Sequence, residues 1–332
     1  MMHLVHYSSH WDDSLRKFLY NNFPHRNKKY LDWWLNQSLH SKKDLQNRTF
    51  MVVDESNRIV ACTTALWTKM KIRTRFYNMY WAGNTIVDEN YRGKGIGRMV
   101  YEQMNLFRDR CSTGFTKAAY AIQPKIIKQF TNLSSVFVYL SFNICFMRNL
   151  WDRLLRNSIK QDDLIYPNQI DIKHVHFERV DNIELIEFPS DGFWQNDTIE
   201  LIRDKDFFRK RFIDIYRKYI IYQSKVDNEI VGYFVVRPAK YKGFNLLSLV
   251  DFRYKNENIE NSIIKAVAKI ARNNKIGMFI TLTSLKKKFL SSGCTIRTSK
   301  VLYGGTTMAE IKEDDFMLIT SADSDLDFVY YG

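Results

Sequence analysis

The stretch from Thr85 to Met104, TIVDENYRGKGIGRMVYEQM, constrains the fold of this chain more than any other. A β-branched, apolar run ends at Val87, a short polar turn follows, and an amphipathic pattern begins at Ile96. This order predicts a strand, a glycine-rich loop and the first turn of a helix. Because a helix N-terminus offers free backbone N–H groups and a positive dipole end, the stretch is suited to bind an anion.

The predicted loop alternates glycine with basic or apolar residues. Its glycines allow positive φ angles and let the backbone come close to phosphate oxygens. A Walker loop needs GxxxxGK[ST] and a dinucleotide fingerprint needs GxGxxG, whereas this loop reads GxGxG. We therefore interpret it as a pyrophosphate site of another kind. The predicted anion-binding residues are Arg92, Gly93, Lys94, Gly95, Ile96, Gly97 and Arg98.

The length of the chain bounds the number of its structural units, and its net charge bears on the kind of partner it binds. With 332 residues the chain is long enough for two units of ordinary size, and 45% apolar residues can build real cores. The net charge of +14 favours an acidic or phosphorylated partner. No aromatic RNA-binding motif and no long block of like charge occurs, so we do not expect nucleic acid as the partner.

Several features bear on the cellular location. The four cysteines are scattered without a CxxC pair, which is typical of reduced thiols. The N-terminus lacks the basic and apolar regions of a signal peptide. The longest uncharged run, Phe130 to Met147, contains several Ser, Thr and Asn residues and is too polar for a transmembrane segment. We expect a cytoplasmic protein without a membrane span.

Hydrophobic periodicity predicts alternating strands and helices along the first half. The predicted strands before the loop are 49–53, 59–71 and 77–87, and the loop helix is 95–108. After it, the pattern predicts a strand at 115–122, a helical stretch from Pro124 towards Leu140, a strand at 142–147 and a helix at 149–160.

The second half repeats this plan, with a similar hairpin, strand, helix and strand. We therefore divide the chain into domains 1–160 and 161–332 and infer a tandem duplication. The copies differ at the loop, because the second reads YKNENIE from Tyr254 to Glu260, with no glycine and two carboxylates. Acids at a helix N-terminus satisfy its dipole and repel a pyrophosphate, so we expect only the first copy to bind one.

The run from Arg92 to Gly97 fits the pattern [QR]-x-x-G-x-[GA], and the approach from Val87 to Tyr91 fits V-x-P-x-Y except for Glu89 in place of Pro. In these residues the chain resembles the GNAT superfamily of N-acetyltransferases. The resemblance implies an α+β fold of two tandem GNAT-like domains, each a mixed, mostly antiparallel sheet flanked by helices. Domain 1–160 would be catalytic, and the degenerate 161–332 would shape the substrate site or a dimer contact.

The resemblance also implies the chemistry. Acetyl-CoA would be the co-substrate, no metal would be needed, and a primary amine would attack the thioester directly. Ile86 and Val87 would contact the pantetheine arm, with the Val87 N–H near the thioester oxygen. Such a reaction needs a base for the amine and a proton donor for the departing thiolate.

The proton donor is where the sequence departs from the family. GNAT enzymes often place a Tyr on the helix after the loop-following strand, four residues before a Gly-Phe pair. Aligning Leu140-Ser141-Phe142 with that region puts Phe137, which has no hydroxyl, at the Tyr position. Tyr120, Tyr139 or solvent remain as alternatives.

The base is equally open. Asp88 and Glu89 follow the strand end and fit a role in the turn at least as well, and His25 and His40 are further candidates. His174 and His176 share one strand face but lack a further ligand, so we expect no metal there.

The acceptor and assembly rest on the resemblance alone. The resemblance to tandem proteins of this kind favours an amino sugar as the acceptor, which could be a nucleotide-linked sugar of surface polysaccharide synthesis. Whether the protein forms a homo-oligomer stays open. One alternative is a non-catalytic CoA-binding module. Another is an aminoacyl transferase of the peptidoglycan-bridge type using aminoacyl-tRNA, against which the intact CoA loop speaks.

Overall fold

The computed structural model describes residues 2–24, 26–36, 48–115, 117–127, 129–155, 164–186, 198–213, 217–285, 295–323 and 327. Unit 1 comprises 1–134 and 302–316, and unit 2 comprises 135–301 and 317–332. This division differs from the expected segments 1–160 and 161–332, since residues 135–160 belong to unit 2 and 302–316 to unit 1. Among the described residues, no helix is long and apolar enough to cross a membrane.

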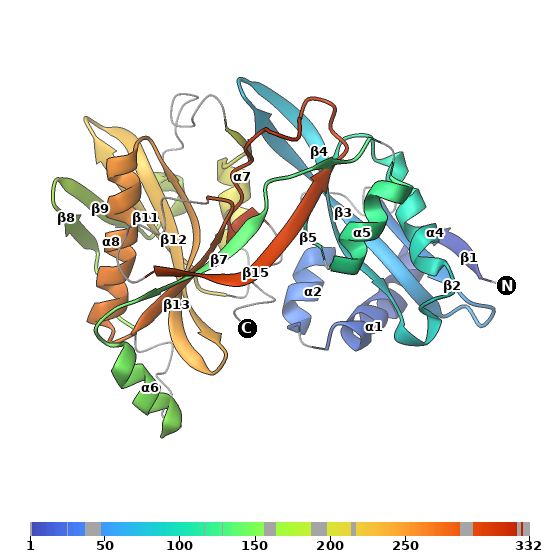
Figure 1. Ribbon diagram of the computed structural model, residues 1–332, viewed down its shortest axis with the longest axis horizontal. Helices are drawn as coiled ribbons and strands as arrows, with labels where there is room; N and C mark the ends of the chain where they lie inside the picture. Colours follow the sequence, from blue (N-terminus) through green and yellow to red (C-terminus); the bar gives the residue numbers. More distant parts are fainter. Residues whose placement is uncertain are drawn as a thin grey trace. The chain divides into compact units, whose positions relative to one another are not determined.

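Unit 1 is a mixed sheet with helices packed against it (Figure 1). Its strands β1 to β4 form consecutive antiparallel pairs, β5 runs parallel to β4, and the end of β15 runs antiparallel to β5. The strands are β1 (His3–His6), β2 (Thr49–Val53), β3 (Ile59–Ile72), β4 (Arg75–Val87), β5 (Arg110–Phe115), β6 (Thr131–Asn132) and, from residue 302 on, the end of β15 (Thr295–Thr306). The helices are α1 (Asp12–Asn22), α2 (Lys28–Leu35), α4 (Ile96–Gln103) and α5 (Lys117–Ile126).

Helix α4 is held to the sheet by its apolar stripe. Ile96 and Val100, one turn apart, are buried against Val52, Val60 and Ala61 of β2 and β3. This spacing puts both side chains on one helix face, as the sequence pattern predicts. The packing fixes the start of α4 next to the end of β4.

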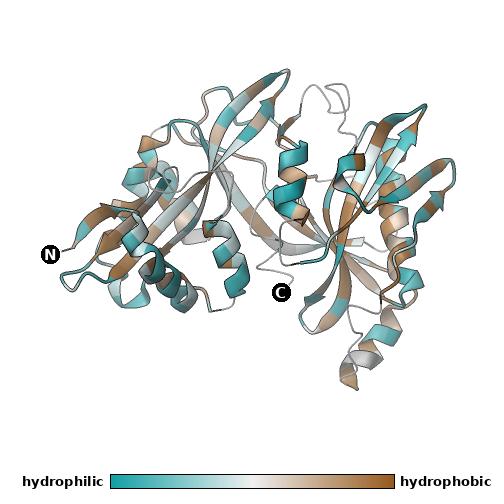
Figure 2. Ribbon diagram, turned by 180° about the vertical axis from the view of Figure 1, so that it is seen from behind, coloured by the Kyte–Doolittle hydropathy of each residue, from teal (hydrophilic) through white to brown (hydrophobic). Residues whose placement is uncertain are grey.

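Unit 2 has the same kind of architecture, and Figure 2 shows apolar residues alternating with polar ones along many of its strands. Strands β8, β9, β11, β12 and β13 form consecutive antiparallel pairs, β14 runs parallel to β13, and β7 pairs with β14. The strands are β7 (Val136–Phe142), β8 (Gln169–Ile172), β9 (Val175–Val180), β10 (Ile199–Leu201), β11 (Ile220–Val226), β12 (Glu229–Tyr241), β13 (Phe244–Tyr254) and β14 (Met278–Thr283). The helices are α6 (Phe146–Leu154), α7 (Lys205–Phe208) and α8 (Glu257–Asn273).

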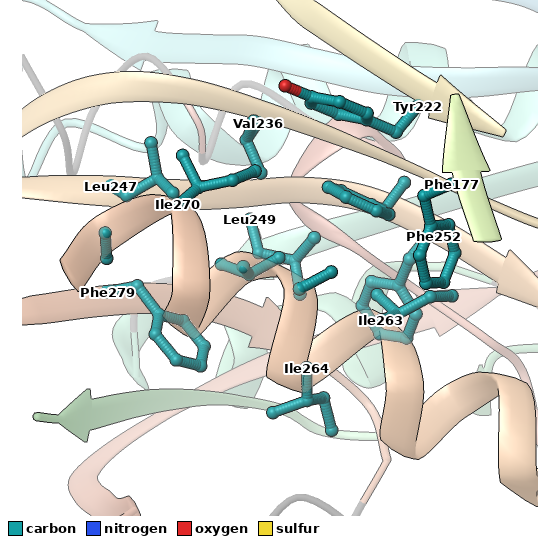
Figure 3. Packing of buried hydrophobic residues seen from close by; sticks show 14 of the residues in the cluster. Phe177, Tyr222, Val236, Leu247, Leu249, Phe252, Ile263, Ile264, Ile270 and Phe279 are labelled. Atoms are coloured by element: carbon teal, nitrogen blue, oxygen red, sulfur yellow. The ribbon is translucent and has the colours of Figure 1, made fainter. Parts of the chain in front are cut away.

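The core of unit 2 lies between α8 and its sheet. Figure 3 shows Ile263 and Ile270 of α8 among Leu249 and Phe252 of β13 and Phe177 of β9. All five side chains are at most 1% exposed. Burial of each such side chain contributes roughly 1.5–3 kcal/mol, which makes α8 a stable part of the unit.

The expected fold class, mixed α+β with mostly antiparallel sheets flanked by helices, is confirmed in both units. The order β2-β3-β4-α4-β5 in unit 1 recurs as β11-β12-β13-α8-β14 in unit 2. In each unit three antiparallel strands lead into a helix and then a strand parallel to the third.

The element predictions between residues 110 and 150 are wrong. Helix α5 occupies most of the predicted strand 115–122, with Pro124 inside it, while β7 lies where a helix towards Leu140 was predicted. Helix α6 overlaps the predicted strand 142–147. The reason is that β7 is buried on both faces between Val136 and Tyr139, and a continuous apolar run has no period that separates strand from helix.

A buried charge network joins β13 to the segment after residue 316 in unit 2. Arg203 Nε lies 2.8 Å from Asp251 Oδ2, and its Nη2 lies 2.5 Å from Asp323 Oδ1. Tyr233 donates a hydrogen bond to Asp251. Burial opposes ionisation of Asp251, but Arg203 and Arg253 outweigh it and lower its pKa to about 2.

We predict that Arg203→Met destabilises the protein by roughly 3–5 kcal/mol in urea unfolding, because it removes the Arg203 pair with buried Asp323 and one of the two cations that face buried Asp251. The control Arg209→Met removes an exposed pair with Glu184 and should cost less than about 1 kcal/mol. The folded pKa of Asp251 lies below its unfolded value near 3.9, so its contribution to stability is present above about pH 4 and is lost as the pH falls towards 2. Equal losses in both variants would contradict this account.

Candidate functional site

Strands β4 and β5 diverge in unit 1. They pair only at Tyr80 with Arg110 and at Trp81 with Cys111. From Ala82 to Val87, the described pairings leave the β5-facing edge of β4 without a strand partner. Such an edge presents backbone N–H and C=O groups that can pair with an extended ligand.

A bulge in β4 lies just past the point of divergence. The register shifts between Thr64, opposite Gly83, and Cys62, opposite Ile86. Asn84 sits in the bulge with φ +51°, a conformation that Asn adopts more readily than most residues, and its side chain accepts a hydrogen bond of 2.6 Å from Arg26. Because a bulge bends its strand, it re-aims the last residues of β4 towards the loop.

The loop after β4 leaves the N-terminus of α4 open. Gly93 and Gly95 have φ angles of +78° and +77°, and Gly95 is the N-cap of α4 with no side-chain hydrogen bond to the helix amides. The first turn of α4 contains no acidic residue. A Cβ added at either glycine would meet no atom within 4 Å, so the space over the loop is open. These features fit a bound diphosphate.

Side-chain contacts fix the turn 88–91 that precedes the glycine loop. Tyr91 donates to Asp54 in the turn between β2 and β3 over 2.7 Å, and Arg58 donates to both. The backbone N–H of Arg58 and the Tyr91 hydroxyl hold the pKa of Asp54 well below its usual range. Asp88 accepts from the backbone N–H of Asn90 at 3.0 Å. Asp88 therefore serves the turn in this structure.

The predicted basic residues all lie on the surface of the loop. Arg92, Lys94 and Arg98 are exposed. Lys94 lies 5.0 Å from the centre of the Tyr91 ring, and Arg98 pairs with Glu102 at 2.8 Å. Their charge adds to the positive end of α4 at one place.

A polar pocket of about 490 Å³ adjoins the loop. It is lined by Arg58, Ile59, Val60, Asp88, Asn90, Tyr91 and Lys94.

Unit 2 has neither an uncapped helix start nor an open strand edge at the equivalent place among its described residues. Asn256 caps α8 by accepting from the Ile259 N–H at 3.2 Å, and Glu257 and Glu260 stand in its first turn. These groups satisfy the helix amides and oppose an anion.

The space where β13 and β14 diverge is occupied by another segment of the chain. Their last pair is Leu249 with Thr281. Beyond it, the Ser284 N–H donates to the Ile319 carbonyl at 3.1 Å, and Thr320 Oγ1 donates to Asp251 of β13 at 2.7 Å. The chain's own segment 317–323 therefore contacts both strands where unit 1 has an open edge.

The structure brings most predicted cofactor residues together. Ile86 and Val87 end β4, half-buried, and the residues from Arg92 to Arg98 follow directly through the loop into α4. Glu89 is exposed in a short 3-10 turn before the loop.

The two candidate tyrosines lie in different units. Tyr120 is on α5, the helix that follows β5, and its hydroxyl donates to Asn132 at 2.8 Å while its ring stacks on Tyr303. Burial, with Tyr303 and Glu313, raises its pKa. Tyr139 is buried on β7 in unit 2 and donates to the Leu285 carbonyl at 2.6 Å.

The alignment that placed Phe137 at the family's Tyr position is wrong, because Phe137 lies on β7 and not on a helix. The helix after β5 is α5, which carries Tyr120. The Ala-rich composition of KAAYAIQ was the available signal for that helix. His25 and His40 lie outside the described residues.

Sequence reasoning missed one buried charge beside the divergence. Arg110, 1% exposed at the start of β5, has a pKa lowered by burial to about 10. Its Nη1 has no hydrogen-bond partner among the residues that the structure describes. Within those residues, no group of three or more His, Cys, Asp or Glu could hold a metal ion, and His176 pairs with Asp171.

Comparison with known proteins bears on this geometry. Residues 9–111 match the model of the acetyltransferase (GNAT) family. No curated protein matches the chain significantly. A probable N-acyltransferase from Enterococcus faecalis V583 shares 13% identity, with 92% of this chain and 72% of that one covered and a TM-score of 0.59.

Two further solved structures are similar. A GCN5-related N-acetyltransferase from Anabaena variabilis is 11% identical, with 92% of this chain and 72% of that one covered and a TM-score of 0.55. Saccharomyces cerevisiae N-myristoyltransferase with bound myristoyl-CoA is 12% identical, with 92% of this chain and 82% of that one covered and a TM-score of 0.56. At such identities the structures show a shared fold.

The segment that matches the family model contains the strand edge, the bulge, the glycine loop and the whole of α4. It ends at Cys111, where β4 and β5 make their last pair. Residues 9–111 thus match the acetyltransferase (GNAT) family, and the chain shares the fold of N-acyltransferases, which supports an acyltransferase.

Proposed function

We propose that unit 1 binds acetyl-CoA and transfers the acetyl group to a primary amine by direct attack on the thioester. The observation that carries the proposal is the uncapped N-terminus of α4 directly after an unpaired strand edge. One end of that arrangement suits a diphosphate and the other suits an extended, amide-containing arm.

Coenzyme A fits this path in one direction. Its diphosphate would be bound by the amides between Arg92 and Gly97, with Lys94 and Arg98 nearby. Its pantetheine arm would pair with β4 from Val87 back towards Ala82, a distance of about 17 Å for a strand of this length. The pocket beside Tyr91, with Arg58 and Lys94 in its lining, offers space for part of the nucleotide end.

The transfer needs a hydrogen-bond donor to the thioester oxygen, a proton donor to the thiolate and a base for the amine. The Val87 N–H, at the end of β4, is the proposed donor to the thioester oxygen. Tyr120 is the proposed proton donor to the thiolate, because it lies on α5, the helix that follows β5, and a tyrosine hydroxyl is protonated at neutral pH. Glu89, exposed before the loop, is the proposed base for the amine, since Asp88 is engaged in the turn.

We further propose that the two units arose by duplication and that unit 2 lost the cofactor site. Two observations support the loss of the site: the segment around Ile319 contacts the strands that diverge, and Asn256 caps α8.

We propose an amino sugar of surface polysaccharide synthesis as the acceptor and the cytoplasm as the location of the protein. The myristoyl-CoA bound by the yeast structure makes acyl chain length a variable to test.

We predict that Gly95→Glu abolishes CoA binding in isothermal titration while the circular dichroism spectrum is unchanged. The new carboxylate stands at the helix N-terminus, where it competes with and repels a diphosphate. Gly243→Glu is the matched control, because Gly243 also has positive φ, at +81°, in an exposed turn of unit 2. Unchanged affinity in Gly95→Glu would contradict the site.

A second prediction concerns turnover. With acetyl-CoA or myristoyl-CoA and a panel of amino sugars, amino acids and polyamines, thiol release should occur with one amine class. Tyr120→Phe should lower kcat by about 100-fold or more and leave the KM for acyl-CoA unchanged, because it removes the proton donor only. An unchanged kcat would assign protonation to solvent. CoA binding without release for any amine would favour a binding module.

A further inference from the structure

Helix α6 of unit 2 exposes a stripe of large apolar side chains. Their exposed fractions are 87% for Ile144, 61% for Met147, 62% for Trp151, 67% for Leu154 and 66% for Leu155. At 100° per residue the three positions inside α6, Met147, Trp151 and Leu154, fall within one arc of about 60°, while Ile144 comes just before the helix and Leu155 just after it. Soluble proteins rarely expose contiguous apolar surface of this kind without a partner.

The opposite face of α6 anchors it to the body of unit 2. Phe146 stacks on Phe244 at the start of β13, with ring centres 6.1 Å apart. Asn149 Oδ1 accepts from the Gly277 N–H at 2.6 Å, and a Cβ at Gly277 would lie 2.3 Å from Phe146 Cα. Helix α6 is therefore fixed with its apolar stripe outwards, beside the turn between β12 and β13 (Figure 1).

The surface around the stripe is basic. The three segments that meet there, 143–151, 240–244 and 272–277, contain no Asp or Glu. They carry five exposed cations, with Asp152 the next residue along α6. These are Arg148, Lys240, Lys242, Arg272 and Lys275.

We infer that this end of unit 2, the α6 surface formed by these three segments and the stripe through Leu155, binds an anionic lipid surface. An apolar ridge that contains Trp151 enters the interface between headgroups and acyl chains. The surrounding Lys and Arg residues attract anionic headgroups, each contributing to the attraction. A second protein could cover the apolar ridge, but a rim whose segments carry five exposed cations and, within 143–155, the single acid Asp152 is complementary to a surface of negative charge.

The inference is independent of the acyl-transfer proposal, since α6 carries none of the residues assigned to it. It is tested by sedimentation with vesicles, using the full chain without acyl-CoA. We expect binding to vesicles of phosphatidylcholine with about one phosphatidylglycerol in three, and much weaker binding to phosphatidylcholine alone. Raised salt should weaken the binding to the mixed vesicles.

Variants separate the two contributions. The double variant Trp151→Ser, Leu154→Ser should bind the mixed vesicles at least about tenfold more weakly. Lys242→Ala should bind them about fivefold more weakly. The matched control is Leu106→Ser in unit 1, since Leu106 is also 67% exposed, and it should bind like the unaltered protein.

Two results would overturn the inference. One is a lack of binding to both kinds of vesicle. The other is equal binding of the double variant and the control. If sedimentation velocity instead showed a dimer that only the double variant dissociates, the α6 surface would be an interface between copies of this chain.

Discussion

The unpaired start of α4 is the constraint on which the functional account of this protein depends. A helix N-terminus normally gains a side-chain acceptor or an acid in its first turn, and α4 has neither. Its amides have no side-chain acceptor because the N-cap residue is Gly95, which has no side chain, and Gly93 and Gly95 both have positive φ. The bulge at Asn84 and the packing of Ile96 and Val100 then hold the loop at the end of the open edge of β4.

Unit 2 shows what the same order of elements does when these two features are closed. Asn256 caps α8, Glu257 and Glu260 add negative charge, and segment 317–323 contacts the strands that diverge. The Arg203 network fastens that segment with charges that are fully buried. Unit 1 therefore leaves helix amides and a strand edge unsatisfied, and unit 2 satisfies the equivalent groups.

The sequence predicted the parts of this fold that depend on local signals. The loop from Arg92 to Gly97, the α4 stripe and the acids at the start of α8 each follow from a few adjacent residues. The helix α5 and the strand β7 could not be predicted in the same way. Strand β7 is buried against β14, more than 130 residues further along the chain, and no local period reports such a partner.

Features of the site that come from long-range contacts were also beyond the sequence. The divergence of β4 and β5 depends on where their pairing stops at Cys111, and the role of Asp88 depends on the turn that it caps. The division of the chain depends on β15, whose residues 302–306 belong to unit 1 and include pairs with β5. Such pairings are set by the packed sheet and not by the residues of one segment.

The crystal structure of the protein with coenzyme A tests the central claim most directly. The account predicts one coenzyme A per chain, with its diphosphate on the backbone amides between Arg92 and Gly97 and its pantetheine arm along the edge of β4. A diphosphate at the start of α8, or an arm that does not follow β4, would contradict it.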